Sequence, residues 1–352
     1  MHTGGMNVDV TGLKDLAQVL NLSTGTVSRA LNGRGNIAQK TRDIVAQTAA
    51  ELNYIPKRRT AGKSDSLQRI GVCIGNPCLS AAGTLDPSFV GLHYMVEMER
   101  AASAVKVAVQ VGFIDAMSDG HRLDQLPVFQ SGDIQGTILV YPFPESFVKQ
   151  LAVRGPVVSI EHTYPTASID TVGPAQSRDA MAAVQYLYDL GHRRIAYVCD
   201  EDARGHKLTM GLRHAGYVSG LMHCGLVYEP DNVANVYSPI VAKANLSDWV
   251  VGRMQAGVTA IITSISRHGY ILWEQLQARG IGVPNELSIV AIGGVHRAKG
   301  LPQLTTWRCS YDAIAATAID ALRARRSGRR KTDLYQEVAS VFVQGQSCGA
   351  PR

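Results

Sequence analysis

The sequence lacks several features that define whole classes of protein. None of its apolar runs approaches the ~20 residues of a membrane-spanning helix, and its six cysteines form no CxxC pair. The opening MHTGGMNVDV has no apolar h-region, so we expect no secretory signal. No Walker A loop, HExxH or GxSxG motif occurs. These absences favour a reduced cytoplasmic protein that is not an enzyme and has no metal site and no cofactor.

The composition is that of a globular protein, with 45% hydrophobic and 18% charged residues in 352 positions. That length predicts two or three domains. The formal net charge is +6, and residues 9–65 carry +4 of it. Such a bias is compatible with a polyanionic partner. On charge alone, an ordinary solvated surface explains it equally well.

The first sixth of the chain has a purely helical pattern. Its apolar spacing predicts three short helices, at residues 13–20, 24–31 and 39–52, with Ser23 as the N-cap of the second. Residues 56–66 read PKRRTAGKSDS, a polar and basic stretch typical of a linker. We therefore expect a headpiece at residues 9–55 and a hinge or linker at 56–67.

From Arg69 onward, strand-like and helix-like segments alternate. Strands are predicted at residues 69–75, 107–113, 136–141, 157–160, 195–199, 260–265 and 288–292, and helices at 178–190, 207–224, 238–255 and 268–279. This pattern predicts an α/β fold with doubly wound parallel sheets. The expected core spans residues 68–345 and has two subdomains, roughly 68–162 with 296–325 and 163–295 with 326–345.

The second helix of the headpiece suggests what the headpiece binds. Two helices joined by a tight turn form a helix-turn-helix, whose second helix can lie in the DNA major groove. Arg29 can pair with guanine and Thr24 can contact a base edge, whereas Gly25 only permits close approach. Periodicity alone would equally fit a helical hairpin without a ligand.

The motif DLAQVLNLSTGTVSRALNG, followed by Leu52, Tyr54 and Pro56, resembles the headpiece of LacI-type bacterial transcriptional regulators. The usual turn glycine is Asn21 here, which tolerates left-handed geometry. The resemblance implies that Thr24, Gly25 and Arg29 read bases, and that further headpiece residues contact DNA. These further residues are Thr11, Ser23, Thr26, Ser28, Asn32, Asn36, Lys40, Thr41 and Tyr54; contact by Lys57, Arg58 and Arg59 is expected from the charge of the linker.

Later motifs extend the resemblance over almost the whole chain. LGHRRIAYV, RHAGY (residues 213–217), GIGVP and PQLTT match family patterns, and they imply a periplasmic-binding-protein-like core with an effector cleft. The implied effector-binding residues are Phe89, Tyr141, Gln176, Arg213, Ser266 and His296. For Arg213, a structural salt bridge is the alternative reading.

The core departs from the family where acidic effector contacts are usual. The common Asn-Asp after the strand AIITS is Ile265-Ser266 here, and the family's Gly-Phe-Asp-Asp is residues 291–294, AIGG. These departures favour an acid or a phosphorylated metabolite over a neutral sugar as the effector, and loss of effector binding is a further alternative.

The basic segments outside the headpiece helices also depart from the pattern. The linker residues 57–63, KRRTAGK, lack the large apolar side chain with which the family's hinge wedges into the minor groove. We therefore expect electrostatic DNA contact by Lys57, Arg58, Arg59 and Lys63. A second basic run, RARRSGRRK at residues 323–331, is interpreted as a solvated helix end, with a second DNA contact as the alternative.

Together these features predict a sequence-specific transcriptional regulator, most simply a repressor. Its expected partners are a pseudo-palindromic operator in double-stranded DNA, a small-molecule effector and a second copy of the chain, with a tetramer left open. A periplasmic-type solute-binding receptor is the competing reading, because it shares the core fold, and an enzyme on the same scaffold is a further one.

Overall fold

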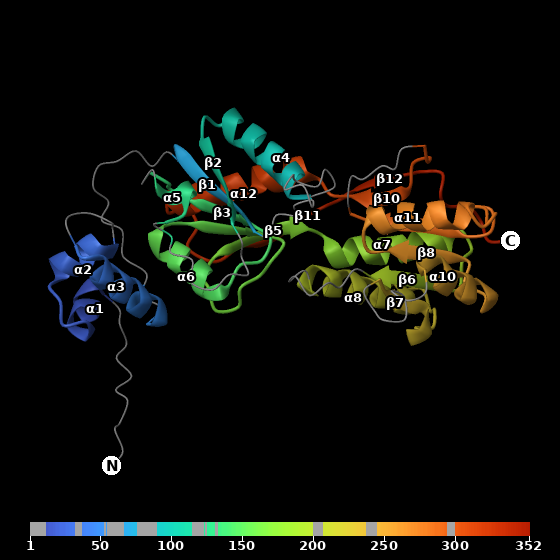
Figure 1. Cartoon of the computed structure of the whole chain (residues 1–352), viewed down its shortest axis with the longest axis horizontal. Coiled ribbons are helices and arrows are strands. Elements are labelled where there is room, and N and C mark those ends of the chain that lie inside the picture. Colours follow the sequence, from blue (N-terminus) through green and yellow to red (C-terminus); the bar gives the residue numbers. More distant parts are fainter. Residues whose placement is uncertain are drawn as a thin grey trace, which may run out of the picture. The chain divides into compact units, whose positions relative to one another are not determined.

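A computed structural model describes most of the chain. The described residues are 12–31, 37–52, 54, 67–75, 90–114, 123, 125–130, 133–199, 207–236, 245–293 and 300–352. The chain divides into two compact units. The N-terminal unit comprises residues 1–77, 95–171 and 315–335, and the C-terminal unit comprises 78–94, 172–314 and 336–352. Figure 1 traces both units along the sequence.

The headpiece is a three-helix cluster with its own small core. Its helices are α1 (Leu13–Val19), α2 (Thr24–Leu31) and α3 (Gln39–Glu51). Leu16 and Ala17 of α1 pack against Val27 of α2 and Val45 of α3. The predicted boundaries of α2 are confirmed, and those of α1 and α3 agree to within one residue. Helices this short are marginal alone in water, so the shared core is what orders them.

The first sheet belongs largely to the N-terminal unit. Its order is β11-β5-β4-β3-β1-β2, with bounds β1 (Arg69–Gly75), β2 (Ala108–Ile114), β3 (Thr137–Val140), β4 (Val157–Ile160), β5 (Asp170–Pro174) and β11 (Tyr335–Val338). The helices that accompany it are α4 (Val90–Ala104), α5 (Pro127–Gln130), α6 (Glu145–Arg154) and α12 (Tyr311–Arg326). β1 is buried along almost its whole length and pairs in parallel with β2 and β3.

The second sheet lies in the C-terminal unit and has the order β12-β10-β9-β8-β6-β7. Its strands are β6 (Ile195–Cys199), β7 (Val233–Asn235), β8 (Ala260–Thr263), β9 (Ser288–Ile292), β10 (Thr305–Arg308) and β12 (Val341–Val343). Its helices are α7 (Gln176–Asp189), α8 (Lys207–His223), α10 (Leu246–Gln255), α11 (Ser266–Gln277) and the short 3₁₀ turn η1 (Pro230–Asn232). The predicted α/β architecture is confirmed: β6 to β10 are all parallel.

The last crossovers differ from those expected. We assigned residues 296–325 to the first subdomain and 326–345 to the second. Instead β10 pairs with β9 in the second sheet, while β11 lies beside β5 in the first. The antiparallel partner of β10 is β12. Short strands that pair with distant segments leave little local signal, so their sheet could not be read from the pattern.

The basic run at the end of α12 also differs from expectation. Arg325 and Arg330 are not simply solvated, because both contact Asp170, which is completely buried. None of the described helices is long and apolar enough to cross a membrane.

Candidate functional sites in the headpiece and the core

The helix α2 presents one polar face to solvent. Val27 and Ala30 are buried in the headpiece core, whereas Thr24, Gly25 and Arg29 are exposed. The Oγ of Ser23 accepts a hydrogen bond from the backbone N–H of Thr26 (3.0 Å), so the predicted N-cap is confirmed. This capping bond starts the helix at Thr24 and places the three proposed base-reading positions on its first two turns.

The turn before α2 has the geometry that the sequence suggested. Asn21 adopts a φ of 50°, the left-handed conformation that asparagine tolerates better than most residues. The backbone N–H of Leu22 then donates to the carbonyl of Ala17 (2.9 Å), which closes the turn. The substitution of the usual glycine therefore preserves the helix-turn-helix geometry.

Arg29 lies folded back along its own helix. Its Nε donates to the carbonyl oxygen of Gly25 (3.1 Å), and a Cβ atom at position 25 would lie 3.9 Å from the Arg29 guanidinium. The guanidinium has to leave this contact to reach a base edge. The hydrogen bond is exposed, so water can replace the carbonyl oxygen as its acceptor and this release costs little.

The remaining predicted DNA contacts fall into three groups. Lys40 and Thr41 lie in the first turn of α3, where backbone N–H groups and the helix dipole favour a phosphate, and Ser28 is partly exposed on α2. Ser23 and Thr26 form the cap, with their hydroxyl oxygens 2.8 Å apart. Six predicted residues lie outside the described part of the chain: Thr11, Asn32, Asn36, Lys57, Arg58 and Arg59.

The predicted DNA contact by Tyr54 is wrong. Its side chain is only 4% exposed and packs in the headpiece core, and its backbone N–H donates to the carbonyl of Ala49 (2.8 Å). Burial, together with the nearby Asp15, raises the pKa of its phenol. The ring therefore anchors the end of α3 and is not a surface contact for DNA.

In the C-terminal unit, Arg213 and Gln176 meet as the sequence predicted. The Nε of Arg213 donates to Oε1 of Gln176 (2.5 Å), and Nη1 donates to the carbonyl oxygens of Ser264 and Ile292. Arg213 is 5% exposed. In the described part of the chain its hydrogen-bond acceptors are all neutral oxygens, and it forms no salt bridge with an acidic residue. The guanidinium thus sits at the carboxyl ends of β8 and β9, where doubly wound sheets bind ligands.

Two neighbours of Arg213 were missed at the level of sequence. Gly293 has a φ of +69°, and a Cβ there would lie 2.8 Å from the Arg213 guanidinium. The Oγ of Ser264 is completely buried and has no hydrogen-bond partner among the described residues. The glycine could have been noticed within AIGG, but nothing in the sequence marks the serine.

Other predicted effector residues lie near strand ends. Ser266 is buried at the first position of α11, directly after β8. In the N-terminal unit, Tyr141 follows β3 at a φ of 73°, and Glu161 follows β4 at 66°. Bulky residues held at positive φ are strained and often mark functional sites. Phe89 and His296 lie outside the described residues.

Asp179 is a further buried group near Arg213. It lies one turn after Gln176 on α7 and accepts a hydrogen bond from Ser340 Oγ (2.6 Å). Burial raises the pKa of its carboxyl, against the lowering effects of Ser340 and Arg213. Among the residues that the structure describes, no cluster of histidine, cysteine and acidic side chains could hold a metal ion.

Comparisons with known proteins agree with both parts of the structure. The family model described as "Bacterial regulatory proteins, lacI family" matches residues 12–57, and the one described as "Periplasmic binding protein-like domain" matches residues 184–348. The HTH-type transcriptional repressor CytR of Escherichia coli K12 is 27% identical over 308 residues, covering 84% of this chain and 83% of that protein.

Two solved structures support the fold along nearly the whole chain. The transcriptional regulator CelR–cellobiose complex superposes with a TM-score of 0.64 at 19% identity, covering 95% of this chain and 99% of that one. The lac repressor dimer bound to operator and the anti-inducer ONPF gives 0.61 at 20% identity, covering 97% and 99%. With the exposed face of α2, these matches lead to one conclusion: the chain combines a LacI-family DNA-binding headpiece with a periplasmic-binding-protein-like core, the architecture of its relatives among the LacI-type transcriptional repressors.

Proposed function

We propose that the chain is a repressor that binds a pseudo-palindromic operator as a homodimer and responds to a small molecule bound in its core. The observation that carries the proposal is the exposed face of α2, where Thr24, Gly25 and Arg29 face solvent on a helix fixed by its own core. One such helix reads a half-site, so two copies related by a two-fold axis read a palindrome. DNA binding also implies action in the cytoplasm, where the operator lies.

Exposed apolar side chains support a homodimer. Val96 on α4 is 50% exposed and Phe113 on β2 is 45% exposed. β2 is the outer strand of its sheet, so a second copy can cover this apolar surface isologously. Sedimentation of the full chain at micromolar concentration should show a dimer, and Val96→Glu with Phe113→Glu should shift it toward monomer.

The operator is found by selection from random duplex DNA with the full-length chain. We expect a palindromic consensus with half-site centres about 34–36 Å apart. Arg29→Ala should weaken binding to this consensus by about 1–3 kcal/mol and relax preference at one base pair per half-site. Lys40→Ala is the control, since it should weaken selected and random DNA about equally. Equal weakening of both by Arg29→Ala would contradict base reading by Arg29.

The proposed effector site is the region around Arg213. Its guanidinium, the amide of Gln176 and the buried hydroxyl of Ser264 offer polar groups to a sugar, an acid or a phosphorylated metabolite. The structurally similar regulator CelR was solved as a complex with cellobiose. Calorimetric screening of these three ligand classes should find a binder, and Arg213→Gln should abolish its effect on operator affinity without changing operator affinity of the unliganded protein. Unchanged ligand binding in this variant removes Arg213 from the site.

A solute-binding receptor without a role in DNA regulation is the second candidate, but no observation favours it. Solute binding alone does not explain the ordered headpiece with its capped and exposed helix α2. A chain that binds the ligand and no duplex would support it.

A further inference from the structure

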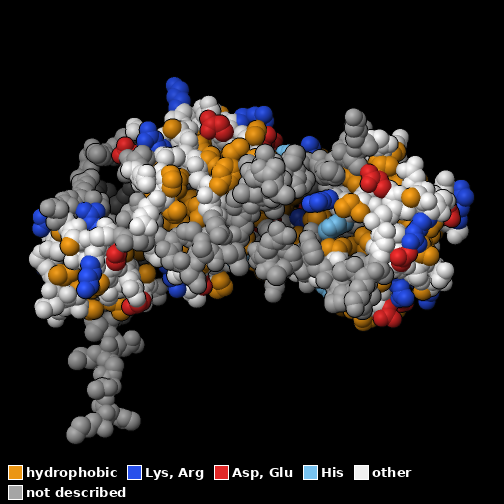
Figure 2. All heavy atoms as spheres, viewed as in Figure 1, with side chains coloured by type: hydrophobic (Ala, Val, Ile, Leu, Met, Phe, Trp, Pro, Cys, Tyr) orange, Lys and Arg blue, Asp and Glu red, His pale blue; other side chains and the backbone are white. Residues whose placement is uncertain are grey.

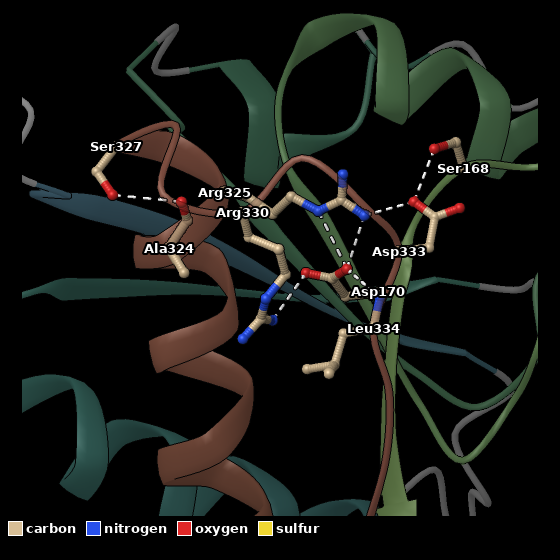
Figure 3. A network of polar contacts seen from close by, with 8 residues as sticks. All are labelled: Ser168, Asp170, Ala324, Arg325, Ser327, Arg330, Asp333 and Leu334. Carbon is tan, nitrogen blue, oxygen red and sulfur yellow. Dashed lines mark hydrogen bonds and ion pairs between the residues drawn. The ribbon is translucent and has the colours of Figure 1, made fainter.

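The cations at the end of α12 fall into two groups. Arg325 donates from Nε and Nη2 to Oδ1 of Asp170 (3.0 and 2.8 Å), and Arg330 lies 3.5 Å from Oδ2 of the same carboxylate. Figure 3 shows both guanidinium groups turned toward Asp170, with Asp333 bound to Arg325 as well. These two arginines are matched by two carboxylates. The other cations of residues 323–331 are not used in this network.

The end of α12 lies beside the starts of β1 and β3. Nη1 of Arg326 donates to the carbonyl of Gln135 (3.4 Å), two residues before β3. Oε1 of Gln135 in turn accepts from the backbone N–H of Gln68 (2.6 Å), and the N–H of Gln135 donates to the carbonyl of Arg69 (3.0 Å). Gln68 and Arg69 come directly after the linker. The basic end of α12 thus lies where the chain enters the core from the headpiece.

Three exposed cations at this edge have no acidic partner in the described part of the chain. Arg329 and Lys331 follow α12, and Lys106 precedes β2, whose first residue Ala108 donates to the carbonyl of Gln68 (2.8 Å). Within the described residues, the Arg329 side chain makes a single hydrogen bond, from Nε to Ser327 Oγ (3.1 Å).

Two neighbouring cations do have partners. Arg69 lies 4.0 Å from Asp133, and Arg323 lies 3.3 Å from Asp320. All four side chains are at least 42% exposed, so these pairs are weak. Each pair is neutral and adds no net charge to the edge. The net charge there is therefore positive, because it comes from Arg329, Lys331 and Lys106.

Some exposed arginines of the C-terminal unit are paired as well. Arg194 lies 3.9 Å from Glu229, and Arg279 is paired with Asp248. Figure 2 shows acidic and basic side chains interspersed over this unit on the face drawn. Exposed arginines without an acidic partner in the described part of the chain occur there too, for example Arg308 and Arg352. What distinguishes Arg329, Lys331 and Lys106 is their position at the edge next to the linker.

We propose that Arg329, Lys331 and Lys106 form a second DNA-contacting surface, on the core itself, that binds backbone phosphates of the duplex held by the headpiece. Residues 55–66 join Tyr54 to this edge, and such a tether spans at most about 45 Å. A duplex carries one negative charge per about 1.7 Å of axis, so phosphates lie within reach of any cation near it. Phosphate contacts carry no sequence information, so this surface adds affinity without altering the operator preference set by α2.

The test is the salt dependence of DNA binding by the full-length chain. The probe is a 40-base-pair duplex of random sequence, titrated between about 50 and 300 mM KCl. The variant Arg329→Gln with Lys331→Gln should lower the log–log slope by up to about 1.8 per protomer, because each lost phosphate contact removes about 0.9. The matched control is Arg308→Gln with Arg352→Gln, two exposed arginines of the C-terminal unit, which removes the same charge and should leave the slope unchanged.

A cross-linking experiment tests contact directly. Arg329→Cys carrying a photoactivated cross-linker should attach to the bound duplex, whereas Arg308→Cys with the same reagent should not. Equal slopes for the double variant and its control, or equal cross-linking at the two positions, would overturn the proposal. These outcomes are distinct from a failure of the proposed function, in which the unmodified chain binds no duplex at all.

Discussion

Two arginines, one in each unit, are held in opposite ways. In the N-terminal unit, Arg325 donates to the completely buried Asp170 and to Asp333, so its charge is matched by carboxylates. In the C-terminal unit, Arg213 is held by an amide oxygen and two main-chain carbonyls. Both side chains donate several hydrogen bonds, but of the two only Arg325 forms salt bridges with carboxylates in the described part of the chain.

This difference separates a structural site from a ligand site. A cation bound to buried carboxylates has little charge left to offer, and removing either partner strands the other in a low-dielectric environment. A cation held by carbonyl dipoles keeps its charge and can still attract polar or anionic oxygens of a ligand. The comparison thus supports assigning the Asp170 network to stability and Arg213 to effector binding.

The largest effect is expected from removal of Asp170. Asp170→Ala leaves Arg325 and Arg330 without their shared buried carboxylate and also removes the acceptor of the Leu334 N–H (2.8 Å). Loss of one partner of a buried ion pair costs about 3–5 kcal/mol. Urea unfolding followed by far-ultraviolet circular dichroism measures this loss.

Asp333→Ala provides the matched comparison. Its carboxylate binds the same arginine but is 49% exposed, so its removal should cost less than about 1 kcal/mol. Equal destabilisation by the two substitutions would show that Asp170 is not the centre of the network.

A smaller effect is expected when Arg213 is replaced. Arg213→Gln breaks no salt bridge among the described residues and leaves the oxygens of Gln176, Ser264 and Ile292 with fewer donors, which should cost about 1–3 kcal/mol. All three tryptophans, Trp249, Trp273 and Trp307, lie in the C-terminal unit, so tryptophan fluorescence reports unfolding of that unit. A loss as large as that of Asp170→Ala would contradict the distinction drawn between the two arginines.

Local patterns in the sequence were sufficient for the headpiece. The spacing of Leu16, Ala17, Val27 and Val45, with Ser23 before the second stripe, fixed α1 to α3 to within a residue. The strands β1, β4, β6 and β9 likewise matched because each is a continuous apolar run. The prediction that Tyr54 contacts DNA was wrong because a motif shows which residue occupies a position, but not whether its ring points into the core.

Contacts between distant segments could not be predicted in the same way. Asp170 and Arg325 are 155 positions apart, and no local pattern links them, so the run at residues 323–331 was interpreted as solvated. Arg213 and Gln176 were predicted together only because both match family positions, not because spacing brings them together. The pairing of β10 with β9 was not predicted because the sequence of a four-residue strand does not indicate which sheet the strand joins.

The smallest effect concerns a buried histidine that stabilises only the C-terminal unit. His192 is 1% exposed, with Nδ1 2.8 Å from Thr259 Oγ1 and Nε2 2.9 Å from the carbonyl of Gly349. Because the carbonyl accepts only, Nε2 carries the proton, and in the neutral ring Nδ1 accepts from the threonine hydroxyl. This arrangement joins the last residues of the chain to the loops before β6 and β8.

Acid should weaken that junction. Burial is the main cause that lowers the pKa of His192 below its ordinary value of 6.5, and Arg193 lowers it further, against the raising effect of Gly349. A lowered pKa means that the unfolded chain binds the proton more readily, so the contribution of the neutral ring is complete above about pH 6.5 and decreases as the pH falls below it. The urea midpoint from tryptophan fluorescence should therefore drop between about pH 7.5 and 5.5, and His192→Gln should make this drop shallower. His223→Gln, on an exposed position of α8, should leave it unchanged, and an identical drop in both variants would exclude His192 as its source.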